Sequence, residues 1–199
     1  MKKFDKYEKF GAYHWAAYED TQSEYRAHVD HVVNWLAGEA SILDVGAGDG
    51  LITSKLGAIA IEENELAVSL AQEKGAKVEK GSAYNLPQGD KRLDAVFLGD
   101  VIEHLEKPEK ALAEIHRVLI DEGRLYVVWP SEGVVDEYAH KHYTTKELVA
   151  LMQANGFALD GEAYTIKSRN YARFIKQSTY ANHTKKEQQT SVAKGKKAF

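Results

Sequence analysis

The sequence predicts an α/β fold in which a mostly parallel sheet is covered by helices on both faces. Short apolar runs alternate with helix-like patterns over residues 41–157, and this alternation is typical of parallel strands joined by crossover helices. The first apolar run ends in an acid and a glycine-rich turn. The last two apolar runs have no helical pattern between them, so we expect them to pair antiparallel.

Length and composition limit the classes to which the protein can belong. The chain has 199 residues, which suits one domain with a substantial core. Hydrophobic residues make up 44% and charged residues 28%, as in soluble globular proteins. The absence of cysteine excludes disulfides, thiolate nucleophiles and cysteine-bound zinc, and it agrees with a cytoplasmic location. No apolar run is long enough to span a membrane, and the net charge of −4 disfavours nucleic acid as a partner.

Aromatic residues dominate residues 4–18, which show no clean helical or strand period. The simplest interpretation is an apolar flap over one side of the sheet. The functional interpretation is a lid over a substrate, because aromatic side chains dominate pocket linings. Apolar residues then recur at three- and four-residue spacing and predict a helix within residues 21–38. His28 and His31 lie off that apolar stripe, so we expect them to be solvated.

The most informative stretch is SILDVGAGDG, residues 41–50, an apolar strand followed by a glycine-rich loop. Glycine lets the backbone adopt positive φ and approach a ligand closely. A loop of this kind at the carboxyl end of a parallel strand is where open α/β sheets bind nucleotides. A tight turn without a ligand is the competing interpretation. The pattern predicts a very short helix over residues 51–56 immediately after this loop.

A second apolar run, residues 58–61, ends in Glu62. An ionised carboxylate has paired acceptor oxygens, so an acid at this strand end can accept hydrogen bonds from both hydroxyls of a ribose. A solvated acid is the alternative, because Glu63 follows directly. A helix over residues 65–74 and a strand over residues 77–80 are predicted next.

The rest of the chain continues the alternation. The predicted elements are a strand over 93–98, a helix starting near Pro108 whose inner face includes Leu119, a turn at 121–123, a strand over 124–129, a helix starting at Thr144 or Thr145, and strands near 157–164 and 169–175. Residues 178–199 are basic and almost without apolar side chains, which predicts a disordered tail. Residues 1–177 are therefore expected to form a single domain with its core in 41–177.

Several of these stretches together resemble one family. ILDVGAGDG resembles the first motif of the class I S-adenosylmethionine-dependent methyltransferases. AIAIEENELAVSLAQEKG is similar to their ribose-binding segment, and KGSAYNLP to the stretch that flanks the adenine. The similarity continues through LDAVFLGDVIEHLEKPEKALAEIHRVLIDEGRLYVVWP and HKHYTTKELVALMQANGF, so it covers residues 41–157. The VIEHL stretch resembles the branch of ubiquinone-biosynthesis O-methyltransferases.

The resemblance implies a Rossmann-like, doubly wound sheet of seven strands, mostly parallel with an antiparallel last strand. It also implies S-adenosyl-L-methionine as the cofactor. The cofactor-binding positions carried over from the family are Asp44, Gly46, Ala47, Gly48, Glu62, Glu63, Ser82, Ala83 and Asp100. Asp100 would stand where the methyl donor and the acceptor meet. Ser82 occupies the place where the family commonly has an aspartate, which predicts a weaker contact with the adenine amino group.

A methyltransferase that acts on an oxygen or nitrogen of a small-molecule acceptor is the function that we expect. The acceptor must lose a proton, and histidine is the natural general base near neutral pH. The candidates are His104, His140 and His142, and the residues expected at the reacting atoms are His104, Asp100 and His140. For each histidine alone, a structural role is the competing interpretation. This favoured interpretation requires no metal ion, and the sequence does not define an oligomeric state.

Two other functions remain open. The spacing of Asp100, Glu103, His104 and a later histidine resembles the divalent-metal site of RNA-terminal 2′-O-methyltransferases, although the net charge speaks against RNA. A dinucleotide-dependent oxidoreductase, or a catalytically silent nucleotide-binding protein, could use the same sheet. Leu51 disfavours the dinucleotide interpretation, because the sixth position of that fingerprint requires glycine or alanine for helix packing.

Overall fold

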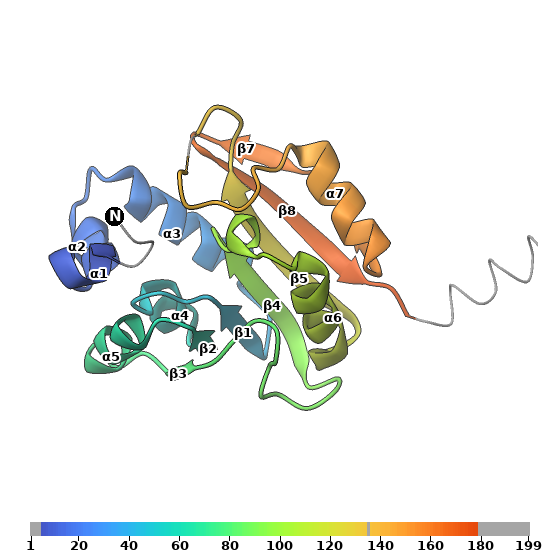
Figure 1. Cartoon of the computed structure of the whole chain (residues 1–199), viewed down its shortest axis with the longest axis horizontal. Coiled ribbons are helices and arrows are strands. Elements are labelled where there is room, and N and C mark those ends of the chain that lie inside the picture. Colours follow the sequence, from blue (N-terminus) through green and yellow to red (C-terminus); the bar gives the residue numbers. More distant parts are fainter. Residues whose placement is uncertain (1–4, 135, 179–199) are drawn as a thin grey trace, which may run out of the picture.

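A single mixed sheet with helices on both faces forms the protein (Figure 1). The computed structural model describes residues 5–134 and 136–178, so the predicted tail lies outside the described residues apart from Ser178. None of the helices within this described part is long and apolar enough to cross a membrane.

The helices and strands follow the predicted alternation closely. The helices are α1 Asp5–Phe10, α2 Tyr13–Glu19, α3 Glu24–Trp35, α4 Leu51–Leu56, α5 Glu65–Glu73, α6 Pro108–Val118 and α7 Thr145–Ala154, with a 3₁₀ turn η1 at Ile102–His104. The strands are β1 Ile42–Val45, β2 Ile59–Glu62, β3 Val78–Lys80, β4 Leu93–Gly99, β5 Leu119–Pro130, β6 Phe157–Leu159, β7 Tyr164–Ile166 and β8 Arg169–Lys176. Helix α7 begins at a capping box in which Thr144 and Glu147 satisfy each other's backbone amides.

The strand order is β3-β2-β1-β4-β5-β8-β6, and β7 pairs with β8 outside this path. Strands β1 to β5 are parallel, while β8 runs antiparallel between β5 and β6. The predicted mostly parallel sheet with an antiparallel last strand is therefore confirmed. The described part of the sheet has eight strands rather than seven, because the strand predicted over 157–164 ends at Leu159 and a further strand, β7, begins at Tyr164 after a turn that contains Gly161 at φ +88°.

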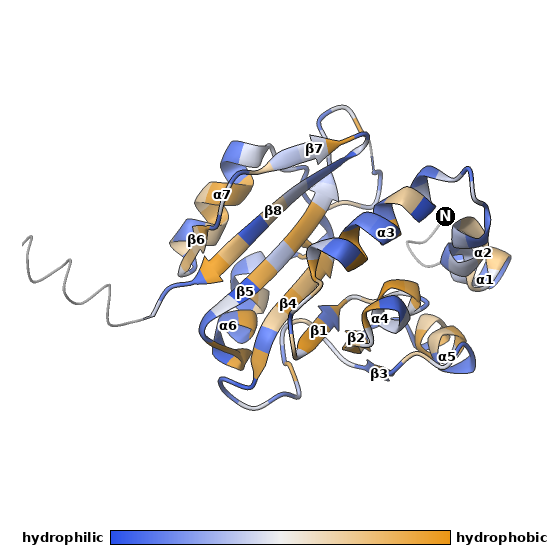
Figure 2. Cartoon of the chain, turned by 180° about the vertical axis from the view of Figure 1, so that it is seen from behind, coloured by the Kyte–Doolittle hydropathy of each residue, from blue (hydrophilic) through white to orange (hydrophobic). Residues whose placement is uncertain are grey.

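Each central strand is buried on both faces. In β4, Val96 and Leu98 belong to the core beneath α6 and α7. The alternate residues Ala95 and Phe97 pack with α3 on the other face. Figure 2 shows the resulting apolar colour along β1 and β4. Because successive side chains of a strand point to opposite faces, two covered faces require the nearly continuous apolar runs seen in the sequence.

Some local predictions are wrong for identifiable reasons. Leu119 begins β5 instead of lying on the preceding helix, because it pairs with Leu93 and is fully buried there. Residues 121–123, predicted as a turn before the strand, lie inside β5, where the pairing with β4 shows a register shift. The aromatic N-terminal segment, in which the sequence shows no clean period, forms α1 and α2. His28 is buried instead of solvated, because the Tyr171 hydroxyl lies 2.8 Å from its Nδ1.

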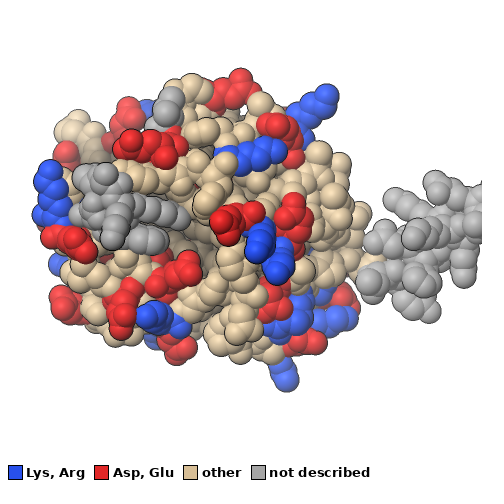
Figure 3. Space-filling view, viewed as in Figure 1, with Lys and Arg blue, Asp and Glu red and all other residues tan. Residues whose placement is uncertain are grey.

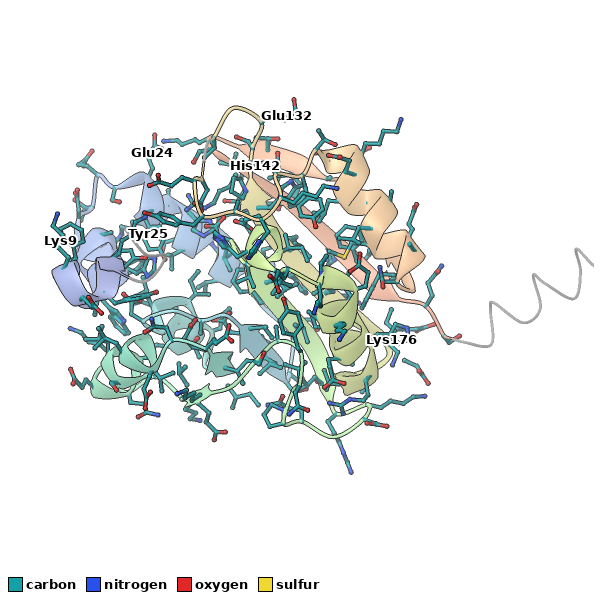
Figure 4. The ribbon with its side chains drawn as sticks, in the orientation of Figure 1. Lys9, Glu24, Tyr25, Glu132, His142 and Lys176 are labelled. Atoms are coloured by element: carbon teal, nitrogen blue, oxygen red, sulfur yellow. The ribbon has the colours of Figure 1, made fainter. Side chains whose placement is uncertain are left out.

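The carboxyl ends of the parallel strands meet at one end of the sheet. The two N-terminal helices and the loop between β5 and α7 lie around this end (Figure 1). Figure 4 places Tyr25 and His142 at this end and Lys176 at the opposite end. The topology therefore brings the glycine-rich loop, Glu62 and the residues after β4 to one place, as open α/β sheets do at their ligand sites.

Candidate active site

A cavity of about 740 Å³ occupies the carboxyl end of the sheet. This volume falls in the range of about 300–1,000 Å³ that is typical of small-molecule sites. The sequence-predicted residues that line the cavity are Asp44, Gly46, Ala47, Gly48, Glu62, Glu63, Ser82, Ala83, Asp100 and His104. His140 and His142 are exposed and are not among the lining residues, so the structure does not bring these two candidates to the cavity.

The glycine-rich loop between β1 and α4 forms one wall of the cavity. Gly46 has φ +79° and Gly48 has φ +56°, in the left-handed region that side chains disfavour. A Cβ atom on Gly46 would lie 2.6 Å from a methyl carbon of Val101. On Gly48 it would collide with the Tyr7 hydroxyl. Glycine is thus required at both positions by backbone conformation and by the close approach of neighbours.

Glu62 lies at the end of β2 and is 7% exposed. Its Oε2 accepts a hydrogen bond from the Gly48 backbone N–H at 2.9 Å, and its Oε1 accepts one from the Asn64 N–H at 2.7 Å. These two bonds fix the carboxylate beside the glycine-rich loop. Each oxygen keeps a second lone pair, so the group can still accept two hydroxyl donors from a ligand.

Asp44 lies in β1, one residue before the strand ends, and is 3% exposed. The pKa of this carboxyl is raised to about 7, mainly by burial; the Thr53 hydroxyl opposes the shift and the nearby Glu62 adds to it. Thr53 donates a hydrogen bond of 2.6 Å to Asp44 Oδ2. Asp44 can therefore change its charge near neutral pH at the base of the cavity.

The N-terminal cap, defined as α1 and α2 (residues 5–19), lies against the glycine-rich loop. Asp49 of the loop is fully buried and accepts a hydrogen bond from the His14 backbone N–H at 2.9 Å. Its other oxygen lies 3.1 Å from His14 Nδ1. The Trp15 indole N–H donates to the Asp49 backbone carbonyl at 2.8 Å. The aromatic N-terminal segment thus contacts the glycine-rich loop directly.

An aromatic wall continues from the cap across the cavity. It consists of Tyr7, Tyr13, His14 and Tyr25, all of which line the cavity. Ring centroids lie 5.2 Å apart for Tyr7 and Tyr13, 4.0 Å for Tyr13 and His14, and 5.1 Å for His14 and Tyr25. At the far end, the Arg169 guanidinium carbon lies 6.0 Å from the Tyr25 ring centroid.

Asp100 follows β4 at φ +53°, an unusual conformation for a residue other than glycine. The Arg169 Nε donates to Asp100 Oδ2 at 2.8 Å, and both side chains are partly buried. This ion pair holds Asp100 in place directly after the end of β4. Backbone strain of this kind is common at functional sites, where surrounding contacts maintain it.

His104, in η1, connects the residues after β4 with the loop after β5. Its Nδ1 lies 3.3 Å from the Tyr138 carbonyl oxygen, and its Nε2 lies 3.3 Å from Asp136 Oδ2. Both of these neighbours are hydrogen-bond acceptors. The Glu103 carbonyl also accepts from the backbone N–H groups of His140 and Lys141, which fixes the loop to η1.

The metal-site hypothesis required Asp100, Glu103, His104 and a later histidine in one place. Asp100 is instead paired with Arg169, and the side chains of His140 and His142 are exposed. Across residues 5–134 and 136–178, no group of three or more histidine, aspartate or glutamate side chains is arranged to hold a metal ion.

Sequence reasoning missed four residues of the site. Arg169 and Tyr25 belong to no motif, and only the fold brings them to the cavity. Asp49 lies inside the glycine motif, but nothing in the pattern indicates its contacts with α2. Tyr7 belongs to the aromatic segment, whose composition pointed to a lid without identifying which ring meets Gly48.

Comparison with known proteins agrees with this geometry. Residues 43–127 match a family described as a methyltransferase domain. The chain is 32% identical over 117 residues to the uncharacterized methyltransferase YcgJ of Bacillus subtilis, covering 51% of this chain and 46% of that protein. It is 31% identical over 128 residues to an uncharacterized methyltransferase of Schizosaccharomyces pombe, covering 57% of this chain and 49% of that protein. The chain thus spans about half the length of these curated relatives.

A solved structure extends the similarity of the fold beyond the matched region. An S-adenosylmethionine-dependent methyltransferase of Thermotoga maritima, described as a possible histamine N-methyltransferase, superposes with a TM-score of 0.70 at 23% identity. The superposition covers 87% of this chain and 96% of that chain.

Proposed function

We propose that this chain is a class I S-adenosylmethionine-dependent methyltransferase, as the match of residues 43–127 to a methyltransferase domain and the fold similarity support. The cofactor is S-adenosylmethionine, and in our proposal the acceptor atom is an oxygen or nitrogen of a small molecule. The observation that carries the proposal is the joint geometry of the glycine-rich loop and Glu62 at one end of a single cavity. A bound S-adenosylmethionine supplies an activated methyl group, so the protein contributes mainly binding and alignment.

The residues that line the cavity fit this cofactor. The Glu62 carboxylate, fixed by two backbone N–H groups, has the free lone pairs needed to accept both ribose hydroxyls. Gly46 and Gly48 keep the loop backbone open to the amino-acid end of the cofactor. Ser82 and Ala83 line the same cavity beyond Glu62 and would flank the adenine. Asp44 supports the floor of this site through Thr53.

Several features support a small acceptor. The cavity is bounded by the N-terminal cap on one side and by Val134, Asp136, Glu137 and Tyr138 on the other, and its volume suits a small ligand. On the face seen in Figure 3, lysine and arginine side chains alternate with aspartate and glutamate. A surface that binds RNA usually gathers basic side chains along the path of the phosphate backbone. The charge distribution therefore favours a small molecule over RNA.

Asp100 is the residue that we propose at the transfer site, and His104 lines the same cavity. The Asp100–Arg169 pair would orient the acceptor near the methyl group. His104 could remove a proton only after releasing the Asp136 carboxylate or the Tyr138 carbonyl, because both ring nitrogens face acceptors. In the observed arrangement His104 is therefore better suited to holding the loop after β5. We do not retain His140 as a base, because its exposed side chain lies outside the cavity lining.

Calorimetry with S-adenosylmethionine, S-adenosylhomocysteine and NAD tests the proposal. We expect binding of the first two ligands and none of NAD. A panel of phenols, quinols, amines and short RNAs, assayed with methyl-labelled S-adenosylmethionine, then identifies the acceptor class. Binding of NAD without a response to S-adenosylhomocysteine would contradict the proposed function.

A further inference from the structure

Helix α2 receives its N-terminal hydrogen-bond acceptor from another part of the chain. The residue at its own N-cap position, Ala12, has no side chain that can cap the helix. The backbone N–H of His14, in the first turn, donates instead to the carboxylate of Asp49 in the glycine-rich loop. A loop residue that is 35 positions away in the sequence thus satisfies one of the orphan donors of this helix.

Helix α2 is also held at its C-terminal end, where the Tyr18 hydroxyl donates to Asp30 of α3 and Arg26 donates to the Tyr18 carbonyl, but these bonds do not reach its N-terminal turn. It has seven residues, and none of them is fully buried. Isolated helices of this length are unstable in water, because nucleation costs more than a few hydrogen bonds return. The remaining polar contacts with the loop also converge on Asp49, through His14 Nδ1 and the Trp15 indole N–H. The order of the N-terminal turn of α2 should therefore depend on the position of this one residue.

The same residue is tied to the cofactor side of the cavity. Asp49 directly follows Gly48, whose backbone N–H donates to Glu62. Tyr7 of α1 contacts Gly48 from above, so α1 and α2 meet the loop at adjacent residues. Any ligand that fixes the loop through Gly48 and Glu62 also fixes the Asp49 carboxylate.

The cap is in turn connected to the acceptor side. The aromatic wall leads from Tyr7 and Tyr13 through His14 to Tyr25, and Tyr25 lies beside the Arg169 that holds Asp100. A displacement of α2 would remove His14 from its stack on Tyr25. The cap therefore lies physically between the cofactor loop and the transfer site.

We propose that Asp49 is a positioning residue that couples occupation of the cofactor side to ordering of the cap over the acceptor side. This inference rests on the proposed function, because it takes S-adenosylmethionine as the ligand of the loop. It gives the site an order of events, since the acceptor cavity is completed only after the cofactor has fixed the loop. Allosteric couplings of this kind change affinities by about 5- to 150-fold, and they are reciprocal.

Amide hydrogen exchange of residues 13–19, with and without S-adenosylhomocysteine, measures the coupling without knowledge of the acceptor. In the wild-type protein we expect the ligand to slow exchange by about tenfold. Asp49→Ala should abolish this ligand effect and, by reciprocity, weaken S-adenosylhomocysteine binding by about the same factor. Trp15→Phe removes one hydrogen bond while keeping a ring, so it should reduce both effects. Thr144→Ala is the matched control, because it removes a helix cap at α7, away from the loop.

The outcomes separate the coupling from the proposed function. Calorimetry on the wild-type protein first establishes whether S-adenosylhomocysteine binds, and failure at that step overturns the proposed function and this inference with it. Binding without slower exchange in α2 overturns the coupling alone. The coupling is also overturned if the ligand still slows amide exchange of the cap in Asp49→Ala. It is overturned as well if exchange in Asp49→Ala is faster than in the wild-type protein but the affinity for S-adenosylhomocysteine is unchanged. If Asp49→Ala does not fold, Trp15→Phe against Thr144→Ala decides the question.

Discussion

The cavity has two sides that are built in different ways. On the cofactor side, hydrogen bonds join residues close in sequence: Gly48 and Glu62 are 14 positions apart, and Asp44 and Thr53 are 9 apart. On the acceptor side, Arg169 and Asp100 are 69 positions apart. The first side depends on backbone conformation and backbone N–H groups, whereas the second depends on side chains brought together by the fold.

This difference separates cofactor binding, which many sequences can provide, from acceptor contacts, which depend on individual side chains. Backbone donors and glycine conformations can bind the same cofactor in many sequences, because they do not require a specific side chain at each position. Side chains that converge from η1, β8 and α3 can change one at a time without disturbing the cofactor loop. We therefore expect substitutions on the cofactor side to act on cofactor affinity, and those on the acceptor side to leave it largely unchanged.

The largest effect is expected for Gly48→Val. A branched side chain at φ +56° is strained, and its Cβ would displace the Tyr7 hydroxyl and enter the ligand space. We expect cofactor affinity, measured by calorimetry, to fall by about 3 kcal/mol or more from strain and overpacking combined. Gly57→Val is the control, because Gly57 has a similar φ of +65° with no atom within 4 Å of the added Cβ. If both variants lose cofactor affinity equally, general destabilisation rather than the loop geometry is responsible.

Glu62→Ala should produce the next largest loss. Hydrogen bonds to a charged group are worth about 1.5–3 kcal/mol, and we expect cofactor affinity to fall within that range. Glu63→Ala should cost much less, because Glu63 is exposed whereas Glu62 is held by two backbone N–H groups. Titration of both variants with S-adenosylhomocysteine decides the matter. Equal losses would mean that the ribose contact has been assigned to the wrong acid.

The same contrast explains which features the sequence could predict. Gly48 and Glu62 lie in a continuous pattern of strand, loop and strand, so local periodicity and glycine chemistry were sufficient to place them. Arg169 could not be found, because its role depends on an antiparallel strand returning beside β5. His28 was assigned to solvent from helical periodicity alone, since its partner Tyr171 lies on that same returning strand. His140 was chosen for its chemistry, but the backbone N–H bond to Glu103 leaves its side chain exposed.

Two buried groups near the cavity give opposite pH dependences of stability. Burial lowers the pKa of His28 from 6.5 to about 3, and nearby Arg169 contributes to the same shift. Below pH 6.5 His28 is therefore protonated in the unfolded chain but stays neutral in the folded protein. The contribution of His28 to stability consequently falls as the pH drops towards 3. Burial raises the pKa of Asp44 from 3.8 to about 7, so its contribution to stability falls as the pH rises from 3.8 to 7.

These opposing contributions should become visible when each group is removed. Each group changes the free energy of unfolding by up to about 1.4 kcal/mol per pH unit between pH 4 and 6.5. When the pH is lowered from 6.5 to 5, the free energy of unfolding of Asp44→Asn should fall relative to that of the wild-type protein, because the variant lacks the stability that protonated Asp44 provides. That of His28→Gln should rise relative to the wild-type protein, because the variant lacks the penalty of the buried neutral His28. Urea unfolding at several pH values measures the free energies. Parallel curves for all three proteins would show that neither group is charged differently in the folded and unfolded states.

The smallest effect is expected for the ion pair of the acceptor side. Asp100 and Arg169 side chains are 33% and 26% exposed, so solvent screens their attraction. A double-mutant cycle with Asp100→Asn and Arg169→Gln should give a coupling free energy of about 0.5–1 kcal/mol, near the upper limit for exposed pairs. Arg169→Gln does not touch the glycine-rich loop, so its S-adenosylhomocysteine affinity should change far less than that of Glu62→Ala. A loss of cofactor affinity in Arg169→Gln as large as that in Glu62→Ala would show that Arg169 also binds the cofactor, and the division of the cavity into two sides would then be wrong.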